Sequence, residues 1–169
     1  MTVIPEDVVE SAWREVGSLP ESEAQERIAR ITESQPALLA FVMAGAEDLS
    51  REAQELGVYI FVVVLCMFEK HCGAKLKTVE IEALERMRDG IEESLLALSA
   101  ADEASFEQAA LAESKGQPFV MKYIAEALFD PESNDGVALS EDEIGELSII
   151  MKTVVDALQE ALEAESETN

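Results

Sequence analysis

The sequence has few of the residues that contact nucleic acids or carry acid–base chemistry. Its 169 residues include one histidine, and 12 lysines and arginines stand against 36 aspartates and glutamates, which gives a formal net charge of −24. Contact with phosphates requires clustered cations, so this balance excludes a general nucleic-acid binder and disfavours adsorption to an anionic membrane.

Familiar catalytic motifs are missing as well. The chain has no GxSxG or SxxK motif for a nucleophilic serine and no GxxxxGK[ST] or GxGxxG loop for phosphates. A di-iron bundle needs two Glu-x-x-His pairs, which His71 alone cannot supply. The sequence therefore predicts no catalytic residue and no cofactor.

Aromatic residues, glycines and prolines are also scarce. Aromatics make up 5% of the chain, with eight glycines and five prolines, whereas 48% of the residues are apolar. Strands favour aromatic and β-branched residues and turns favour Gly and Pro, so this composition favours an all-α fold and excludes general disorder. We expect about eight helices, the first with Trp13 on its apolar face beside Val9 and Val16.

Two of these helices have the sequence signature of a capping box at their start. Ser18 with Glu21, and Ser140 with Glu143, have the spacing at which a hydroxyl and a carboxylate satisfy each other's backbone amides. We expect both pairs to form.

Cysteines are too few for a disulfide framework. Cys66 and Cys72 suit free thiols in a reducing compartment, and the first ten residues contain no signal segment. The longest apolar run, Gly57–Phe68, would span about 18 Å as a helix, short of a bilayer core of about 30 Å. We therefore expect a cytoplasmic protein without membrane contact, with this run as a central buried helix.

Two Gln-Pro pairs suggest an internal duplication. Gln35-Pro36 and Gln117-Pro118 lie 82 residues apart, and Phe41 matches Tyr123 at the same offset. We predict two related four-helix repeats packed as one bundle-like domain. The expected domain covers residues 1–165, with repeats over 1–73 and 76–165, and the acidic tail 166–169 is expected to fray.

A pair of glycines supports the same duplication. Gly57 and Gly145 lie 88 residues apart, each near the start of a long helix. Glycine inside a helix costs about 1 kcal/mol relative to alanine, so a neighbouring helix is expected to approach closely at both positions. The expected neighbour is the Gln-Pro helix of the same half, through Phe41 in the first half and Tyr123 in the second.

One acidic loop has part of the spacing of a calcium-binding loop. Asp130, Glu132, Asn134 and Glu141 fall at positions 1, 3, 5 and 12 of an EF-hand loop. Asp135 occupies position 6, however, where the sharp turn requires glycine. An acidic connecting loop is the preferred interpretation, and these residues remain weak metal candidates.

The only local basic cluster comprises Lys70, His71, Lys75 and Lys77. Its charge suits the C-terminal end of a helix, and it is also a candidate contact patch for an acidic neighbour.

The function that these observations favour is a non-enzymatic adaptor or regulatory module that binds another protein. The acidic charge would speed encounter with a basic partner, although it also serves solubility. Two alternatives stay open: an enzyme or small-ligand-binding protein with a site at the repeat junction, and an acidic mimic that occupies a basic DNA-binding protein. Association of identical chains is compatible with all three.

Overall fold

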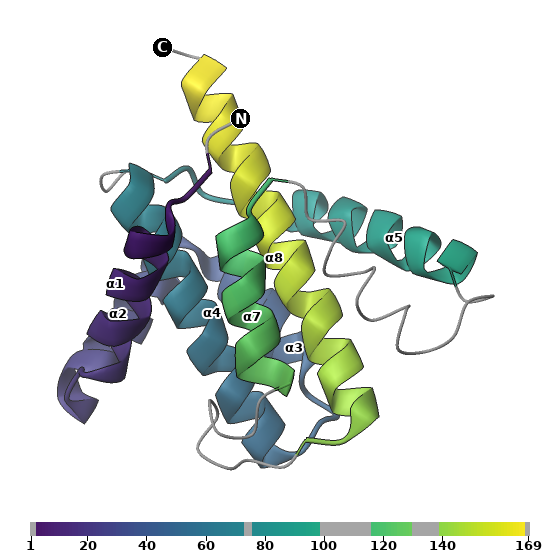
Figure 1. Cartoon of the computed structure of the whole chain (residues 1–169), viewed down its shortest axis with the longest axis horizontal. Coiled ribbons are helices and arrows are strands. Elements are labelled where there is room, and N and C mark those ends of the chain that lie inside the picture. Colours follow the sequence, from purple (N-terminus) through teal and green to yellow (C-terminus); the bar gives the residue numbers. More distant parts are fainter. Residues whose placement is uncertain (1–2, 73–75, 99–115, 130–138, 168–169) are drawn as a thin grey trace.

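The computed structural model describes residues 3–72, 76–98, 116–129 and 139–167, and all regular structure within them is helical (Figure 1). This confirms the all-α prediction. The sixth expected helix, over 99–114, lies outside the described residues. The described helices are α1 (Glu6–Gly17), α2 (Glu21–Ser34), α3 (Pro36–Gly45), α4 (Arg51–Cys72), α5 (Ile81–Leu98), α7 (Pro118–Phe129) and α8 (Glu141–Glu167).

Helix α4 lies at the centre of the molecule. Every residue from Ile60 to Phe68 is buried, because α1, α3, α7 and α8 all pack against this helix. In Figure 1, α4, α7 and α8 run side by side through the middle of the fold. A helix that is apolar on all sides requires such surroundings, as the sequence predicted. Among the described helices, none is long and apolar enough to cross a membrane.

The helices of the two halves pack in matching pairs. Helix α1 packs on α4 and α7, and α5 packs on α8 and α3. Helices α3 and α7 each contact both long helices, and α1 and α5 lie on opposite sides of the central group (Figure 1). Two related repeats would produce this pattern, and the superposition of the halves remains a prediction.

A buried glutamine in each half holds the extended segment that leads into the first helix of the other half. Gln35 is 2% exposed; its Oε1 accepts a hydrogen bond from the Val79 amide and its Nε2 donates to the Lys77 carbonyl, both at 2.9 Å. Gln117 is 1% exposed, and its Oε1 accepts from the Ile4 amide at 2.9 Å. We call Gln35 and Gln117 the glutamine latches.

The starts of α4 and α8 are joined by one carboxylate. Glu143 and Ser140 form the predicted capping box, with amide contacts of 3.1 and 3.2 Å. Glu143 also accepts hydrogen bonds from the Ser50 hydroxyl at 2.5 Å and the Ser50 amide at 2.9 Å. These bonds, led by the one from the Ser50 side chain, lower the pKa of Glu143 to about 2. The Ser50 hydroxyl in turn accepts from the Ala53 amide and caps α4.

The other predicted capping box does not form. Pro20 is the N-cap residue of α2 and makes no side-chain cap, while the Ser18 hydroxyl donates to the Glu15 carbonyl at 3.1 Å. The prediction for Ser18 and Glu21 was wrong because the serine closes the end of α1 instead of opening α2.

The paired glycines differ in their surroundings. A Cβ added at Gly57 would lie 2.9 Å from Leu147 Cδ2, so a helix does approach closely there, but that helix is α8 and not α3. A Cβ at Gly145 would meet no atom of the described residues within 4 Å. The predicted neighbour of Gly57 and the predicted close contact at Gly145 were therefore both wrong. Where α4 and α8 cross, the Leu147 side chain of α8 packs against Gly57 of α4, so the close contact requires a glycine on α4 only.

The glutamine latches should matter to stability. Replacing Gln35 or Gln117 with leucine leaves the buried amide of Val79 or Ile4 without its acceptor, so we expect each change to lower the free energy of unfolding by about 2 kcal/mol. Urea unfolding followed by circular dichroism measures this. The control is Gln25→Leu on the exposed face of α2, which should stay within about 0.5 kcal/mol of wild type. A latch variant as stable as the control would contradict the assignment.

Candidate functional site

Two hollows between α1, α4 and α7 share three lining residues and together form what we call the aromatic cleft. Their volumes are about 240 and 270 Å³, and both are lined by Trp13, Tyr123 and Glu126. Phe119 lines one hollow and Tyr59 the other. Trp13 and Tyr59 are each 41% exposed. A group of exposed aromatic side chains at a concave surface is typical of a binding site.

The helix register places these rings at the edge of the core. Tyr59 and Tyr123 each precede a fully buried isoleucine, Ile60 or Ile124, and Trp13 follows a fully buried alanine. Successive residues on a helix lie about 100° apart, so each ring sits beside the packed face of its helix. Trp13 was expected on the apolar face and lies at its rim instead.

Carboxylates surround the aromatic cleft. Glu6 pairs with Lys122 at 3.6 Å, and Glu10 pairs with Arg14. Glu126 makes no hydrogen bond or ion pair with any described residue. The cleft therefore combines apolar ring surface with one carboxylate that no described cation neutralises.

Two of the rings in the aromatic cleft differ in their electrostatic surroundings: the phenol of Tyr123 is neutral, and the indole of Trp13 lies near a cation. Burial raises the pKa of Tyr123, and the neighbouring Tyr59 adds to that shift, so the Tyr123 phenol keeps its proton. The Arg14 guanidinium lies over the Trp13 ring, 5.6 Å from its centroid. The indole thus already accepts a guanidinium from its own helix.

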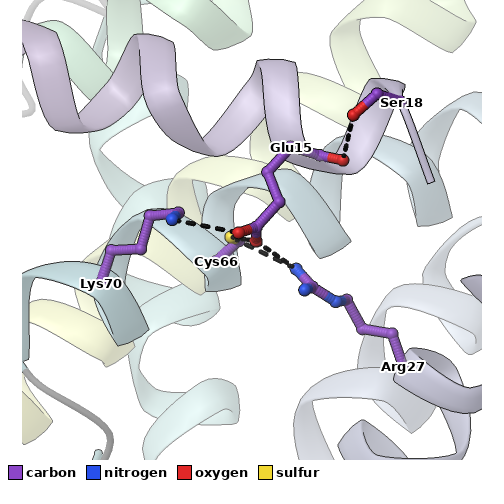
Figure 2. Close-up of polar contacts among 5 residues, drawn as sticks. All are labelled: Glu15, Ser18, Arg27, Cys66 and Lys70. Carbon is purple, nitrogen blue, oxygen red and sulfur yellow. Dashed lines mark hydrogen bonds and ion pairs between the residues drawn. The ribbon is translucent and has the colours of Figure 1, made fainter. Parts of the chain in front are cut away.

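A larger cleft of about 750 Å³ lies between α1, α2 and α4. We call it the ionic cleft and define it by Glu15, Arg27, Cys66 and Lys70, whose side chains converge in Figure 2. The Glu15 carboxylate lies 3.1 Å from both Arg27 Nη1 and Lys70 Nζ. Cys66 Sγ lies 3.2 Å from Glu15 Oε2 and 3.3 Å from Arg27 Nη1.

The groups of the ionic cleft satisfy one another. Burial, and then the hydrogen bond to Glu15, raise the pKa of the Cys66 thiol to about 11, so the thiol stays neutral. Burial acts to raise the pKa of Glu15, but hydrogen bonds from Cys66, Lys70 and Arg27 outweigh it and lower that pKa. A reactive cysteine needs a thiolate. The contacts among Glu15, Arg27, Cys66 and Lys70 therefore suit a structural link between α1, α2 and α4 better than a catalytic site.

The candidate contact patch is only partly described. Lys70 pairs with Glu15 and so turns its charge toward the ionic cleft. His71 is half-buried near the end of α4, Lys77 is exposed, and Lys75 lies outside the described residues. The patch remains untested.

The candidate calcium ligands are also mostly outside the described residues. This holds for Asp130, Glu132 and Asn134, whereas Glu141 is exposed in the first turn of α8. Within the part of the chain that the structure describes, no three His, Cys, Asp or Glu residues are placed to hold a metal ion.

Sequence reasoning missed the aromatic cleft. Tyr123 served only to match the repeats, and Tyr59 lay unnoticed within the longest apolar run. The available signal was that the only tryptophan of an aromatic-poor chain lies next to the buried stripe of a surface helix.

Comparison of the chain with protein-family models, with curated proteins and with solved structures found no match. Function is therefore inferred from the residues of the two clefts.

The Cys66 thiol should be unreactive under mild conditions. With a pKa near 11 against an ordinary value of 9.0, its thiolate fraction at pH 8 is about a hundredfold below that of an unfolded cysteine. A Cys72→Ser variant isolates this thiol, and we expect its alkylation by iodoacetamide at pH 8 to be at least about tenfold slower in the folded chain than in urea.

The raised pKa of the Cys66 thiol also predicts how the stability of the fold depends on pH. Because the folded pKa is raised, the stability contributed by the neutral thiol is complete below about pH 9 and is lost as the pH rises through about 11. Equal alkylation rates for the folded and unfolded chains at pH 8 would contradict the burial and the hydrogen bond to Glu15.

Proposed function

We propose that this chain is a non-enzymatic protein-binding module whose aromatic cleft docks a basic segment of another protein. The observation that carries the proposal is the exposure of Trp13 and Tyr59 beside Tyr123 and the carboxylate of Glu126, which pairs with no described cation. Tryptophan and tyrosine are enriched among the residues that dominate binding energy at protein interfaces. They offer large apolar surface at low entropic cost.

The aromatic cleft has room for side chains of a docked segment. Its two hollows measure about 240 and 270 Å³. Each is large enough for one or two side chains. The preference for a protein partner rests on the exposed rings of Trp13 and Tyr59 rather than on this volume.

Charge favours a basic partner. Glu6, Glu10 and Glu126 all line the cleft, and the whole chain carries a net charge of −24. Such a field steers cationic partners and disfavours acidic ones. Arginine and lysine stems would also cover the exposed rings while their charged ends remain near the carboxylates.

The ionic cleft supports the non-enzymatic part of the proposal. The Cys66 thiol is neutral, and the carboxylate of Glu15, one of three glutamates that line this cleft, is already paired with Arg27 and Lys70. A catalytic group is usually poised near the working pH, and neither Cys66 nor Glu15 has that property.

The test compares capture of a partner by three forms of the chain: wild type, Trp13→Ala and Phe129→Ala. Phe129 is the control, since it is 40% exposed on α7 and does not line the aromatic cleft. We expect wild type and Phe129→Ala to retain the same basic protein from native lysate in stoichiometric amount. Trp13→Ala should weaken that binding by about thirtyfold, as loss of an interface anchor does.

Each form is first checked for native helix content by circular dichroism, so that misfolding is not read as lost binding. Retention of the same partner by Trp13→Ala as by wild type would contradict the proposal, and so would a captured partner whose binding does not weaken with added salt.

A further inference from the structure

An arginine of α5 occupies the seam between α3, α5 and α8. The Arg88 guanidinium lies over the Phe41 ring, 6.0 Å from its centroid. Its Nη2 donates to Glu146 Oε1 at 2.6 Å, and its Nε donates to Glu92 Oε1 at 2.9 Å. Arg88 thus combines stacking on an aromatic ring with two carboxylate partners.

The glutamine latches show which positions of α1 and α5 correspond, and so allow this seam to be compared with the aromatic cleft. One latch binds the Ile4 amide ahead of α1, and the other binds the Val79 amide ahead of α5. Trp13 follows Ile4 by nine residues, and Arg88 follows Val79 by nine residues. Trp13 on α1 and Arg88 on α5 therefore occupy equivalent positions, each counted from the amide that a glutamine latch binds.

The rings on α3 and α7 match in the same way. Phe41 follows Gln35 by six residues, and Tyr123 follows Gln117 by six residues. Helix α5 packs on α3 and α8, as α1 packs on α7 and α4. Tyr123 in the aromatic cleft therefore corresponds to Phe41, the ring on which Arg88 is stacked.

The two seams differ in what fills them. In the seam of Arg88, a guanidinium from the chain itself lies on the Phe41 ring. In the aromatic cleft, Trp13 takes the corresponding helix position but stays 41% exposed, and the space beside Tyr123 and Glu126 is hollow. We infer that an arginine side chain of the partner fills this hollow, stacked on the aromatic rings with Glu126 as its counter-ion. This inference rests on the proposed function.

Arginine fits this hollow better than lysine. Its planar guanidinium stacks on a ring face and can form two hydrogen bonds with one carboxylate, whereas an ammonium is a compact and strongly hydrated charge. The chain itself places an arginine over an aromatic ring twice, Arg88 over Phe41 and Arg14 over Trp13. The hollow of about 270 Å³ has room for the end of such a side chain.

The experiment uses three short peptides that are identical except for two positions, which carry arginine, lysine or the uncharged isostere citrulline. Binding to the full chain is followed by the fluorescence of Trp13, the only tryptophan. We expect the arginine peptide to bind at least about tenfold more tightly than the citrulline peptide and about threefold more tightly than the lysine peptide.

Two carboxylate variants test the counter-ion. Glu126→Gln should weaken binding of the arginine peptide by about tenfold, because, of the carboxylates that line the cleft, it is the one that no described cation pairs. Glu82→Gln, an exposed change on α5 that removes the same single negative charge, should leave the affinity within about twofold.

Four outcomes would overturn the inference: no binding of the arginine peptide at about 10 mM, equal affinity for the citrulline peptide, equal affinity for the lysine peptide, or an unchanged affinity in Glu126→Gln. In each case the proposed function stands if capture of the native partner depends on Trp13. If capture does not depend on Trp13, the proposed function fails independently of the peptide results.

Discussion

The apolar stretch of α4 must be covered on every side, and this requirement arranges the other described helices. Residues Ile60 to Phe68 are all buried, and each large apolar side chain gains roughly 1.5–3 kcal/mol on leaving water. One amphipathic helix can cover only one face of another, so four helices pack around α4. The two longest, α4 and α8, cross where Gly57 admits Leu147.

Covering a central helix with separate helices creates seams between them. The seam among α3, α5 and α8 is closed by Arg88, which stacks on Phe41 and pairs with Glu146. The seam among α1, α2 and α4 is held by the ion pairs of Glu15. The seam among α1, α4 and α7 leaves Trp13 and Tyr59 exposed and forms the aromatic cleft. Function is proposed at this seam, where exposed rings adjoin a carboxylate that pairs with no described cation.

Features that depend on local chemistry could be predicted from the sequence. The helical composition, the buried run in α4 and the capping box at Ser140 all follow from residue types at short spacing. The Gln-Pro pairs were recognised as matching landmarks, but their role as latches was not, because the amides that they bind lie 44 and 113 residues away. Contacts at such separation leave no periodic signal in the chain.

Features that depend on how helices meet could not be predicted. Gly57 and Gly145 have similar local sequence settings, yet Leu147 fills the space beside Gly57, whereas no described residue would lie within 4 Å of a Cβ at Gly145. Trp13 belongs to an apolar stripe by periodicity, but its exposure depends on how closely α7 approaches α1, which a helical pattern does not encode. The candidate site consists of such residues, so only its composition could be read from the sequence: one tryptophan, few aromatics and an excess of acids.

The claim that function centres on an open, acid-lined aromatic cleft is tested most directly by quenching the fluorescence of Trp13, the only tryptophan. An indole that is 41% exposed beside carboxylates should emit near the wavelength of a hydrated indole and be accessible to acrylamide. With each ion's quenching expressed relative to its quenching of free N-acetyltryptophanamide, caesium should be favoured over iodide at least about twofold at low ionic strength, because the carboxylates attract cations and repel anions. Blue-shifted emission that resists acrylamide, or equal relative quenching by iodide and caesium, would contradict the account.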